Sequence, residues 1–285
     1  MVESTAIDLD RNGQSLRLYD YGGDGRPVLI THAASFCAKM WEPVIKSLDS
    51  DRFRFFALDM RGHGHSQPSS ESFSWVEAAH DVVYVSEEIL HLANSDEPLV
   101  GVGHSMGGTS LVMAEIHKPG LFEKIWAYEP VMFSEDNSER EEITESLAAG
   151  ARRRKDGFAS QTEAKERFSS KPPMQFFNTE CLEAFIECGL NQDEVGQVWL
   201  SCRPDFEATI YETAGTGVTS RIGDLGCPVD FVVGEGDGDR VPAVLGLVSA
   251  NEDSQHAVKQ VDRANHFSPF IAPAQIAGLI RDWLS

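Results

Sequence analysis

Short runs of apolar, β-branched and aromatic residues alternate along the chain with longer stretches in which apolar residues recur every three or four positions. The short runs predict β-strands, and the longer stretches predict amphipathic helices. Strands that alternate with helices indicate a mostly parallel sheet with helices on both faces. The predicted fold class is therefore α/β, with a doubly wound sheet. The predicted strands cover residues 16–21, 28–31, 53–59, 99–102, 124–128, 229–233 and 258–261.

Three of the predicted helices have clear ends. A capping box at residues 74–77, Ser-Trp-Val-Glu, begins a helix that runs toward Leu92. A second helix spans residues 106–117 and ends before Pro119, because the residue preceding a proline disfavours helical backbone. The last helix begins near Pro273, which suits the first helical position.

The strand pattern fades between about Ser134 and Arg221, where the chain is charged and mostly helical. A long insertion within an α/β chain is usually functional and is commonly a lid. We therefore predict a core of residues 1–133 and 222–285, with residues 134–221 as a helical cap. The basic run at 152–155 is either a solvated helix end or a feature that attracts an anionic substrate.

Composition narrows the classes of partner and the location. The 285 residues are 41% hydrophobic, enough for a sizeable core, and carry a formal net charge of −21. So acidic a surface repels nucleic acid and anionic membranes, and no apolar run approaches the ~20 residues that span a bilayer. The five cysteines form no C-x-x-C pair, and the first ten residues are unlike a signal peptide. We expect a cytoplasmic protein with a small-molecule substrate, without a cofactor and without a metal site.

Residues 103–107, Gly-His-Ser-Met-Gly, match the pattern G-x-S-x-G between a predicted strand and a predicted helix. That context is typical of a nucleophile elbow, a tight and strained turn that exposes a reactive serine. Gly103 and Gly107 leave room for the turn, and Ser105 is the candidate nucleophile. The amide of Met106, at the start of the helix, is a candidate oxyanion donor.

The chain at this point resembles the capped α/β-hydrolase-fold superfamily, which includes esterases, lactonases, carbon–carbon bond hydrolases and cofactor-free haloperoxidases. The resemblance covers residues of about 16–133 and 227–284. Residues 27–34, Pro-Val-Leu-Ile-Thr-His-Ala-Ala, resemble its oxyanion loop, with Ala33 where a glycine is usual. Residues 59–66 resemble its D-x-R-G-x-G-x-S turn, a structural signature. The resemblance implies that the amide of Ala34 is the second oxyanion donor.

The resemblance also implies a general base and an acid. His266 lies between a predicted strand and the last helix, where the family carries its base, and a histidine can take and return the serine proton. Two carboxylates are candidates for the acid that orients it. Asp237 follows the strand 229–233 in the family's usual acid loop and is favoured, and Glu129 follows the strand 124–128. Both loops end strands at the sheet edge of Ser105.

These residues predict a serine hydrolase that cleaves a carboxylic ester or lactone through an acyl-enzyme intermediate. Carbon–carbon bond hydrolysis and perhydrolysis use the same residues and remain alternatives. A hydrolase-like receptor with little turnover is an alternative from another class. The candidate substrate contacts are Phe36, Phe133, Trp199 and Phe267.

Overall fold

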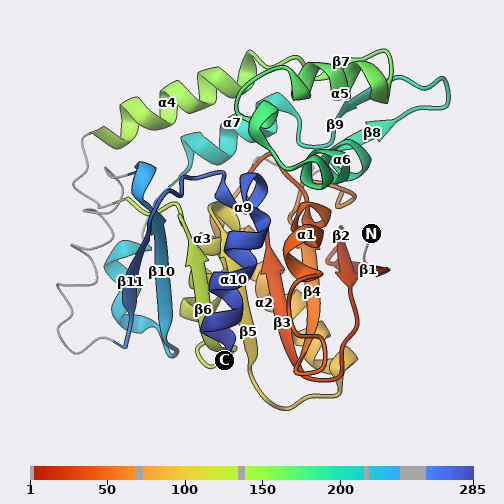
Figure 1. The fold of residues 1–285 in the computed structure, drawn as a ribbon. Helices are drawn as coiled ribbons and strands as arrows, with labels where there is room; N and C mark the ends of the chain where they lie inside the picture. Colours follow the sequence, from red (N-terminus) through yellow and green to blue (C-terminus); the bar gives the residue numbers. More distant parts are fainter. Residues whose placement is uncertain (1–2, 68–72, 134–138, 215–217, 238–254) are drawn as a thin grey trace.

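An eight-stranded sheet forms the centre of the molecule (Figure 1). The computed structural model describes residues 3–67, 73–133, 139–214, 218–237 and 255–285, without the side chains of Glu139 and Asp237. The strand order is β1-β2-β4-β3-β5-β6-β10-β11; β1 and β2 are antiparallel to their neighbours, and the other strands are parallel to one another. The strands are β1 (Thr5–Arg11), β2 (Gln14–Asp20), β3 (Arg26–Thr31), β4 (Phe53–Asp59), β5 (Leu99–His104), β6 (Phe122–Tyr128), β10 (Val229–Gly234) and β11 (Ala257–Val261).

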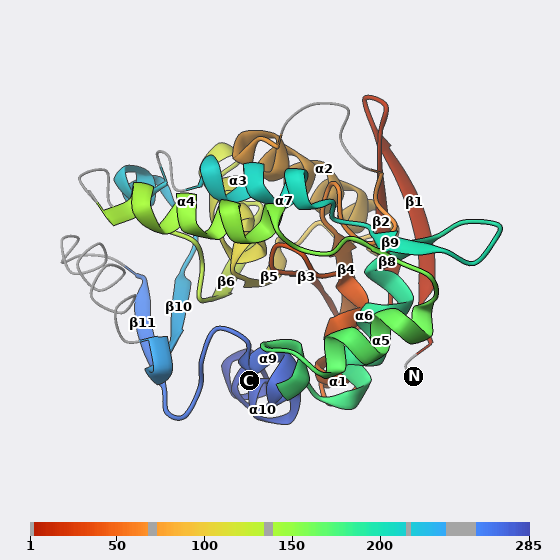
Figure 2. The same cartoon turned by 90° about the horizontal axis from the view of Figure 1, so that it is seen from above.

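Helices cover both faces of this sheet, as the view from above makes plain (Figure 2). On one face α2 (Trp75–Ala93) and α3 (Met106–His117) pack on the larger apolar core, and on the other α1 (Glu42–Ile45) and α10 (Pro273–Leu284) pack on a second one. The central strands are buried on both sides, which explains their uninterrupted apolar sequence. The predicted α/β class with a doubly wound, mostly parallel sheet is confirmed.

The predicted helix starts agree with the local chemistry of the chain. The Ser74 side chain caps α2 by accepting a hydrogen bond from the amide of Glu77. Asn94 ends the same helix in the left-handed conformation, which an asparagine tolerates better than most residues. In the described part of the chain, no helix is both long and apolar enough to cross a membrane.

The first strand, β1, was not predicted. Its side chains are mostly exposed or half-buried, so it lacks the apolar run by which the other strands are recognised. The pair Asn12-Gly13 follows it, with positive φ at both residues, and joins it to β2 as a hairpin. An Asn-Gly pair between two strands is the usual sequence signal for such a turn. The Asn-Gly pair, rather than an apolar run, is therefore the feature of the sequence that indicates β1.

The elements from α4 to α7 lie together above the carboxyl edge of the sheet (Figure 1). The helices among them agree with the prediction that this stretch is mostly helical. The segment also holds a small antiparallel sheet of order β7-β9-β8, which was not predicted because its strands have only two or three residues. The elements are α4 (Glu139–Arg152), β7 (Gly157–Phe158), α5 (Gln161–Ser169), η2 (Met174–Phe176), α6 (Thr179–Cys188), β8 (Leu190–Gln192), β9 (Val198–Leu200) and α7 (Pro204–Glu212).

The remaining short elements lie in the connections between the strands and helices already described. They are η1 (Ala38–Trp41), η3 (Thr219–Asp224), η4 (Glu235–Asp237) and α9 (Ser268–Ile271). Two of them, η4 and α9, follow β10 and β11 at the carboxyl edge of the sheet. The candidate catalytic residues therefore fall at one edge, which is where ligands bind in open α/β sheets.

Candidate active site

Ser105 lies in a strained turn between β5 and α3. Its backbone has φ 53° and ψ −119°, a conformation that costs free energy for a residue with a side chain. The turn is held from both sides, because the Ser105 amide donates to the Tyr128 carbonyl (2.9 Å) and the Gly107 amide donates to the His32 carbonyl (3.1 Å). The surrounding backbone thus imposes the elbow conformation that the motif predicts.

Neighbouring backbone atoms leave no room for a side chain at the two glycines near Ser105. A Cβ atom on Gly103 would lie 2.6 Å from the Cα atom of Gly108, and one on Gly107 would lie 2.6 Å from the carbonyl group of Thr31. These distances are too short for any side chain. The start of α3 can therefore approach β3 and β5 only because both positions carry glycine.

Two backbone amides near Ser105 are left without an acceptor. Met106 is the first residue of α3, so its amide has no partner within the helix. In the loop after β3, the Ser35 amide donates to His63 Nε2 (3.0 Å) and the Phe36 amide to the Ala33 carbonyl (3.3 Å). Among the hydrogen bonds of the described residues, none uses the amide of Ala34 or of Met106. These are the two amides that were predicted to bind an oxyanion.

Two neutral histidines hold the loop that carries Ala34. His32 donates from Nδ1 to the Ala33 carbonyl and accepts at Nε2 from the Met60 amide, and His63 donates from Nδ1 to the Arg61 carbonyl while accepting from Ser35. Both rings are fully buried, and burial lowers the pKa of His32 to about 3 and that of His63 to about 4. A ring that accepts through one nitrogen must be neutral, so geometry and pKa agree.

The role of His63 was not predicted from the sequence. Its ring fixes Ser35, which has a φ of 74° in the middle of the oxyanion loop. Sequence offered one signal, because His63 lies between Gly62 and Gly64 in the turn at 59–66, and both glycines have positive φ. A side chain on such a tight turn is well suited to reach a neighbouring loop.

His266 lies between β11 and α9 in a loop fixed by hydrogen bonds. The Tyr128 hydroxyl donates to the Asn265 carbonyl (2.8 Å), and the Ser268 hydroxyl accepts from the Asn265 amide (2.9 Å). The imidazole of His266 is largely buried and packs beside that of His104, with ring centroids 4.9 Å apart. Because His104 immediately precedes Ser105, this contact places the candidate base next to the elbow.

Glu129 is buried behind His266. Its Oε2 lies 3.8 Å from His266 Nδ1, and its Oε1 accepts from the Gly234 amide (2.5 Å). Glu129 has a φ of 48°, and its own amide donates to the Val232 carbonyl. The other candidate acid, Asp237, ends η4, and the Gly236 amide beside it donates to the Ala264 carbonyl (2.9 Å). The Asp237 side chain lies outside the described residues.

The four candidate substrate contacts are not in one place. Phe36 and Phe267 meet at 6.4 Å between ring centroids, and Phe177 contacts both. Phe133 packs on the edge of the larger core, with its carbonyl accepting from Thr219. Trp199 lines a surface hollow between β7 and β9. The structure thus groups Phe36 with Phe267, and it adds Phe177, which the candidate set did not include.

The sequence of this chain also matches the model of a known protein family. The model of the alpha/beta hydrolase family matches residues 28–279, which is most of the chain. The chain belongs to the alpha/beta hydrolase family. The resemblance stated from the motifs is thereby confirmed.

Individual relatives of this chain are distant. Protein phosphatase methylesterase 1 of Bos taurus is 30% identical over 113 residues, which is 39% of this chain and 29% of that protein. An (E)-2-((N-methylformamido)methylene)succinate hydrolase of Acinetobacter baylyi is 21% identical over 92% of this chain and 91% of its own. The crystal structure of an E-2-(acetamidomethylene)succinate hydrolase has a TM-score of 0.82 at 20% identity, covering 99% of both chains.

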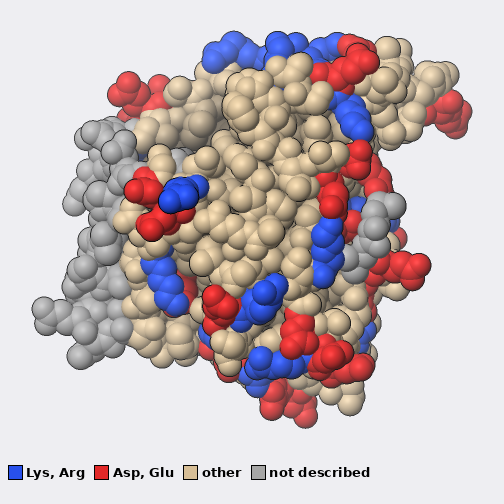
Figure 3. All heavy atoms as spheres, in the orientation of Figure 1, with Lys and Arg blue, Asp and Glu red and all other residues tan. Residues whose placement is uncertain are grey.

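Three of the four basic residues at 152–155 pair with carboxylates. Lys and Arg side chains gather along the upper edge of the face in Figure 3, over the end of α4 and α5. Arg152 pairs with Glu212, Arg154 with Glu207, and Lys155 with Glu163. These pairs use most of the positive charge within the segment itself, which favours the solvated helix end over a site for an anionic substrate.

Proposed function

We propose that this protein is a serine hydrolase that cleaves a carboxylic ester or lactone through an acyl-enzyme intermediate. The observation that carries the proposal is a pair of amides that no described acceptor uses: that of Met106, next to the strained Ser105, and that of Ala34, in the loop that the hydrogen bond from Gly107 to His32 ties to the elbow. Backbone amides aimed at one point and held rigid are what the oxyanion of a tetrahedral intermediate requires. Residues 134–221 form the cap of the site in this proposal.

In the proposed reaction Ser105 attacks the substrate carbonyl while His266 takes its hydroxyl proton. The carbonyl oxygen becomes an oxyanion and is stabilised by the amides of Ala34 and Met106. His266 then returns the proton to the leaving alkoxide, which leaves Ser105 acylated. Water, deprotonated by His266, attacks the acyl group and releases the acid. A carboxylate, Asp237 or Glu129, orients the imidazole and stabilises its charged form.

A fluorophosphonate probe tests the nucleophile directly, because it reacts with an activated serine and requires no knowledge of the substrate. The wild-type protein should be labelled at Ser105 and should hydrolyse a p-nitrophenyl ester, and Ser105→Ala should lose both reactions while keeping its circular dichroism spectrum. Labelling of a different residue, or full activity of Ser105→Ala, would show that the assignment is wrong.

The chain-long match to the Acinetobacter relative favours a second candidate substrate class, the amide of a succinate derivative. The same residues serve it, because His266 can protonate a leaving nitrogen as well as a leaving oxygen. A screen across chain-length esters, lactones, diketones and amide-substituted succinates separates these classes, and added peroxide tests perhydrolysis. Probe labelling with no turnover of any of them would favour the receptor alternative.

A further inference from the structure

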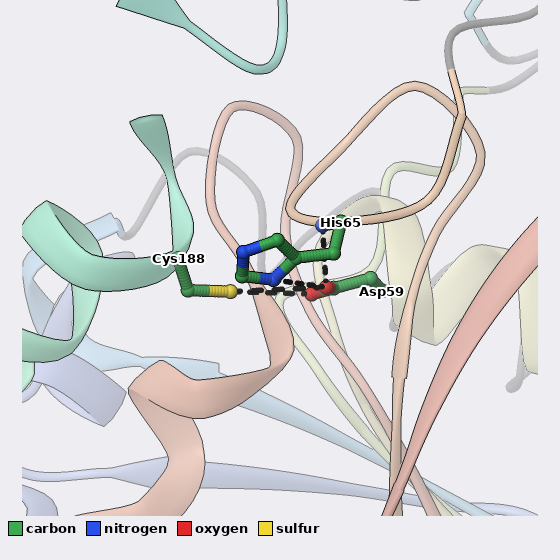
Figure 4. A group of neighbouring side chains, drawn as sticks. All are labelled: Asp59, His65 and Cys188. Carbon is green, nitrogen blue, oxygen red and sulfur yellow. Dashed lines mark hydrogen bonds and ion pairs between the residues drawn. The ribbon is translucent and has the colours of Figure 1, made fainter. Parts of the chain in front are cut away.

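A second group of reactive side chains lies outside the proposed triad. Asp59 at the end of β4, His65 in the turn that follows, and Cys188 at the end of α6 converge on one point (Figure 4). One ligand atom from each lies within 4.8 Å of the others. Asp59 and Cys188 are 129 positions apart in the sequence, so no spacing motif announces the group.

The distances are close to those of a tetrahedral metal site. Cys188 Sγ lies 3.6 Å from Asp59 Oδ1 and 3.7 Å from Oδ2, and His65 Nδ1 lies 3.9 Å from Oδ2. Ligands about 2.0–2.3 Å from a tetrahedral zinc ion are separated by roughly 3.3–3.6 Å. The sulfur and the carboxylate already have this separation. The His65 side chain is 38% exposed and lies at the protein surface, where it has room to adjust toward the other two ligands.

The charge of Asp59 is the second argument. Its carboxylate is fully buried and accepts hydrogen bonds from the amides of Ala38 (2.7 Å) and His65 (2.8 Å). Within the described ranges, the one basic side chain within 4.0 Å of it is His65. The other deeply buried aspartate of the turn region, Asp81, is neutralised by Arg61 and Arg11. Among the described residues, no arginine pairs with Asp59 as Arg61 and Arg11 pair with Asp81. Burying a charge without a counter-charge is costly.

The thiols beside Asp59 are suited to a soft divalent cation. Cys188 and Cys37 are both fully buried and hydrogen-bond to each other. Thiolate, imidazole and carboxylate together are a ligand set that zinc accepts. The Tyr19 hydroxyl contacts His65 Nδ1 (2.8 Å), and Asp59 Oδ2, 3.4 Å away, remains as its partner when that nitrogen binds a metal.

We propose that Asp59, His65 and Cys188 bind one zinc ion or a similar divalent cation, with water completing the coordination from the exposed side of His65. The ion would fasten the end of α6 to the end of β4, and so hold the upper segment against the sheet. The site is separate from Ser105 and His266, so its existence does not depend on the proposed reaction. Binding replaces the Cys188 thiol proton, which is released to solvent.

Cobalt(II) is the probe, because a thiolate bound to cobalt gives a charge-transfer absorption that oxygen and nitrogen ligands do not. The full-length protein is stripped with a chelator, dialysed and titrated with cobalt chloride. We expect the absorption to saturate at one equivalent and to disappear when zinc is added, and we expect zinc to raise the melting temperature.

Three variants locate the site. Cys188→Ser and His65→Gln should lose the saturable absorption and the zinc-dependent stabilisation. Cys181→Ser is the matched control, a buried cysteine of the same helix whose thiol contacts the Met40 carbonyl, and should keep both. If Cys188→Ser does not fold, His65→Gln decides, because its side chain is partly exposed. The proposal is overturned if the wild-type protein gives no thiolate absorption, or if His65→Gln binds cobalt as the wild type does.

Discussion

The carboxylate of Glu129 faces the imidazole of His266 at 3.8 Å, and its second oxygen is held by the amide of Gly234. The distance to Nδ1 exceeds the roughly 2.7–3.2 Å of an ordinary N–H···O hydrogen bond. This geometry suits a charge interaction with a protonated imidazole. We propose that the carboxylate that hydrogen-bonds Nδ1 belongs to the loop that follows β10, where Asp237 ends η4.

We therefore expect Asp237→Asn to lower kcat far more than Glu129→Gln. Loss of the carboxylate that fixes the imidazole tautomer costs on the order of 10⁴ in the reference case. Glu129→Gln removes a charge but can still accept from Gly234, so its loss should be much smaller. Steady-state kinetics on one ester, with unfolding curves to show that both variants fold, make the comparison. The reverse ranking would assign the acid to Glu129.

Acid should destabilise the protein through His32 and His63. Their pKa values are lowered by burial to about 3 and about 4, whereas the unfolded chain protonates them near 6.5. Between these values the unfolded state binds more protons, so the free energy of unfolding rises with pH and is lost as pH falls below about 6.5. Each ring contributes a slope of at most about 1.4 kcal/mol per pH unit.

His63→Gln tests this contribution, because glutamine can still accept from the Ser35 amide but does not titrate. Urea unfolding between pH 7 and pH 4 should show a shallower decline for this variant than for the wild type. His91→Gln is the control, since His91 is exposed on α2. Parallel declines in His63→Gln and wild type would mean that the ring is not held neutral in the folded protein.

Gly107→Ala should damage both stability and activity. The added Cβ would lie 2.6 Å from the carbonyl group of Thr31, so α3 or the oxyanion loop must shift. Overpacking of this kind costs about 1–3 kcal/mol, and the shift displaces the amide of Ala34. Gly278→Ala is the control, because Gly278 lies within α10 with open space around it. That substitution should stabilise the protein by about 0.5–1 kcal/mol; equal effects of the two changes in thermal unfolding would contradict the argument.

Phe177→Ala should change the choice of acyl chain. Phe177 contacts Phe36 and Phe267, so its removal opens space beside the oxyanion loop. Relative kcat/KM values across esters of increasing chain length should shift toward longer acyl groups. Phe168→Ala, whose ring contacts Phe158 and Phe185, should scale all substrates together. Trp199→Ala extends the test to the hollow beside β9, and a shift in that variant alone would place the acyl group there.

Local patterns in the sequence predicted those parts of the molecule that depend on neighbouring residues. The bounds of α3 were predicted to the residue, because a glycine turn and Pro119 limit it at each end. The elbow at Ser105 was recognised because its glycines are required by contacts within a few residues of the turn.

Contacts between distant parts of the chain escaped prediction. The bond from Ser35 to His63 joins residues 28 positions apart, and that between Asp59 and Cys188 joins residues 129 apart. Neither contact produces the two-residue periodicity of a strand or the 3.6-residue periodicity of a helix, so the sequence pattern does not reveal it. The order of strands fixes which loops meet, so such partners emerge only when the sheet has formed. The short strands β7, β8 and β9 were missed because two or three residues are too few to show alternation.

The ring of Phe36 packs both against the segment above the sheet and against α9. Phe36 lies two residues after Ala34, and its ring packs against Phe177 and Phe185 from the segment above the sheet, as well as against Phe270 from below. Displacing Phe177 and Phe185 would remove two aromatic neighbours from the loop that carries Ala34. The packing of the upper segment against one ring therefore helps to fix the backbone position of the proposed oxyanion donor.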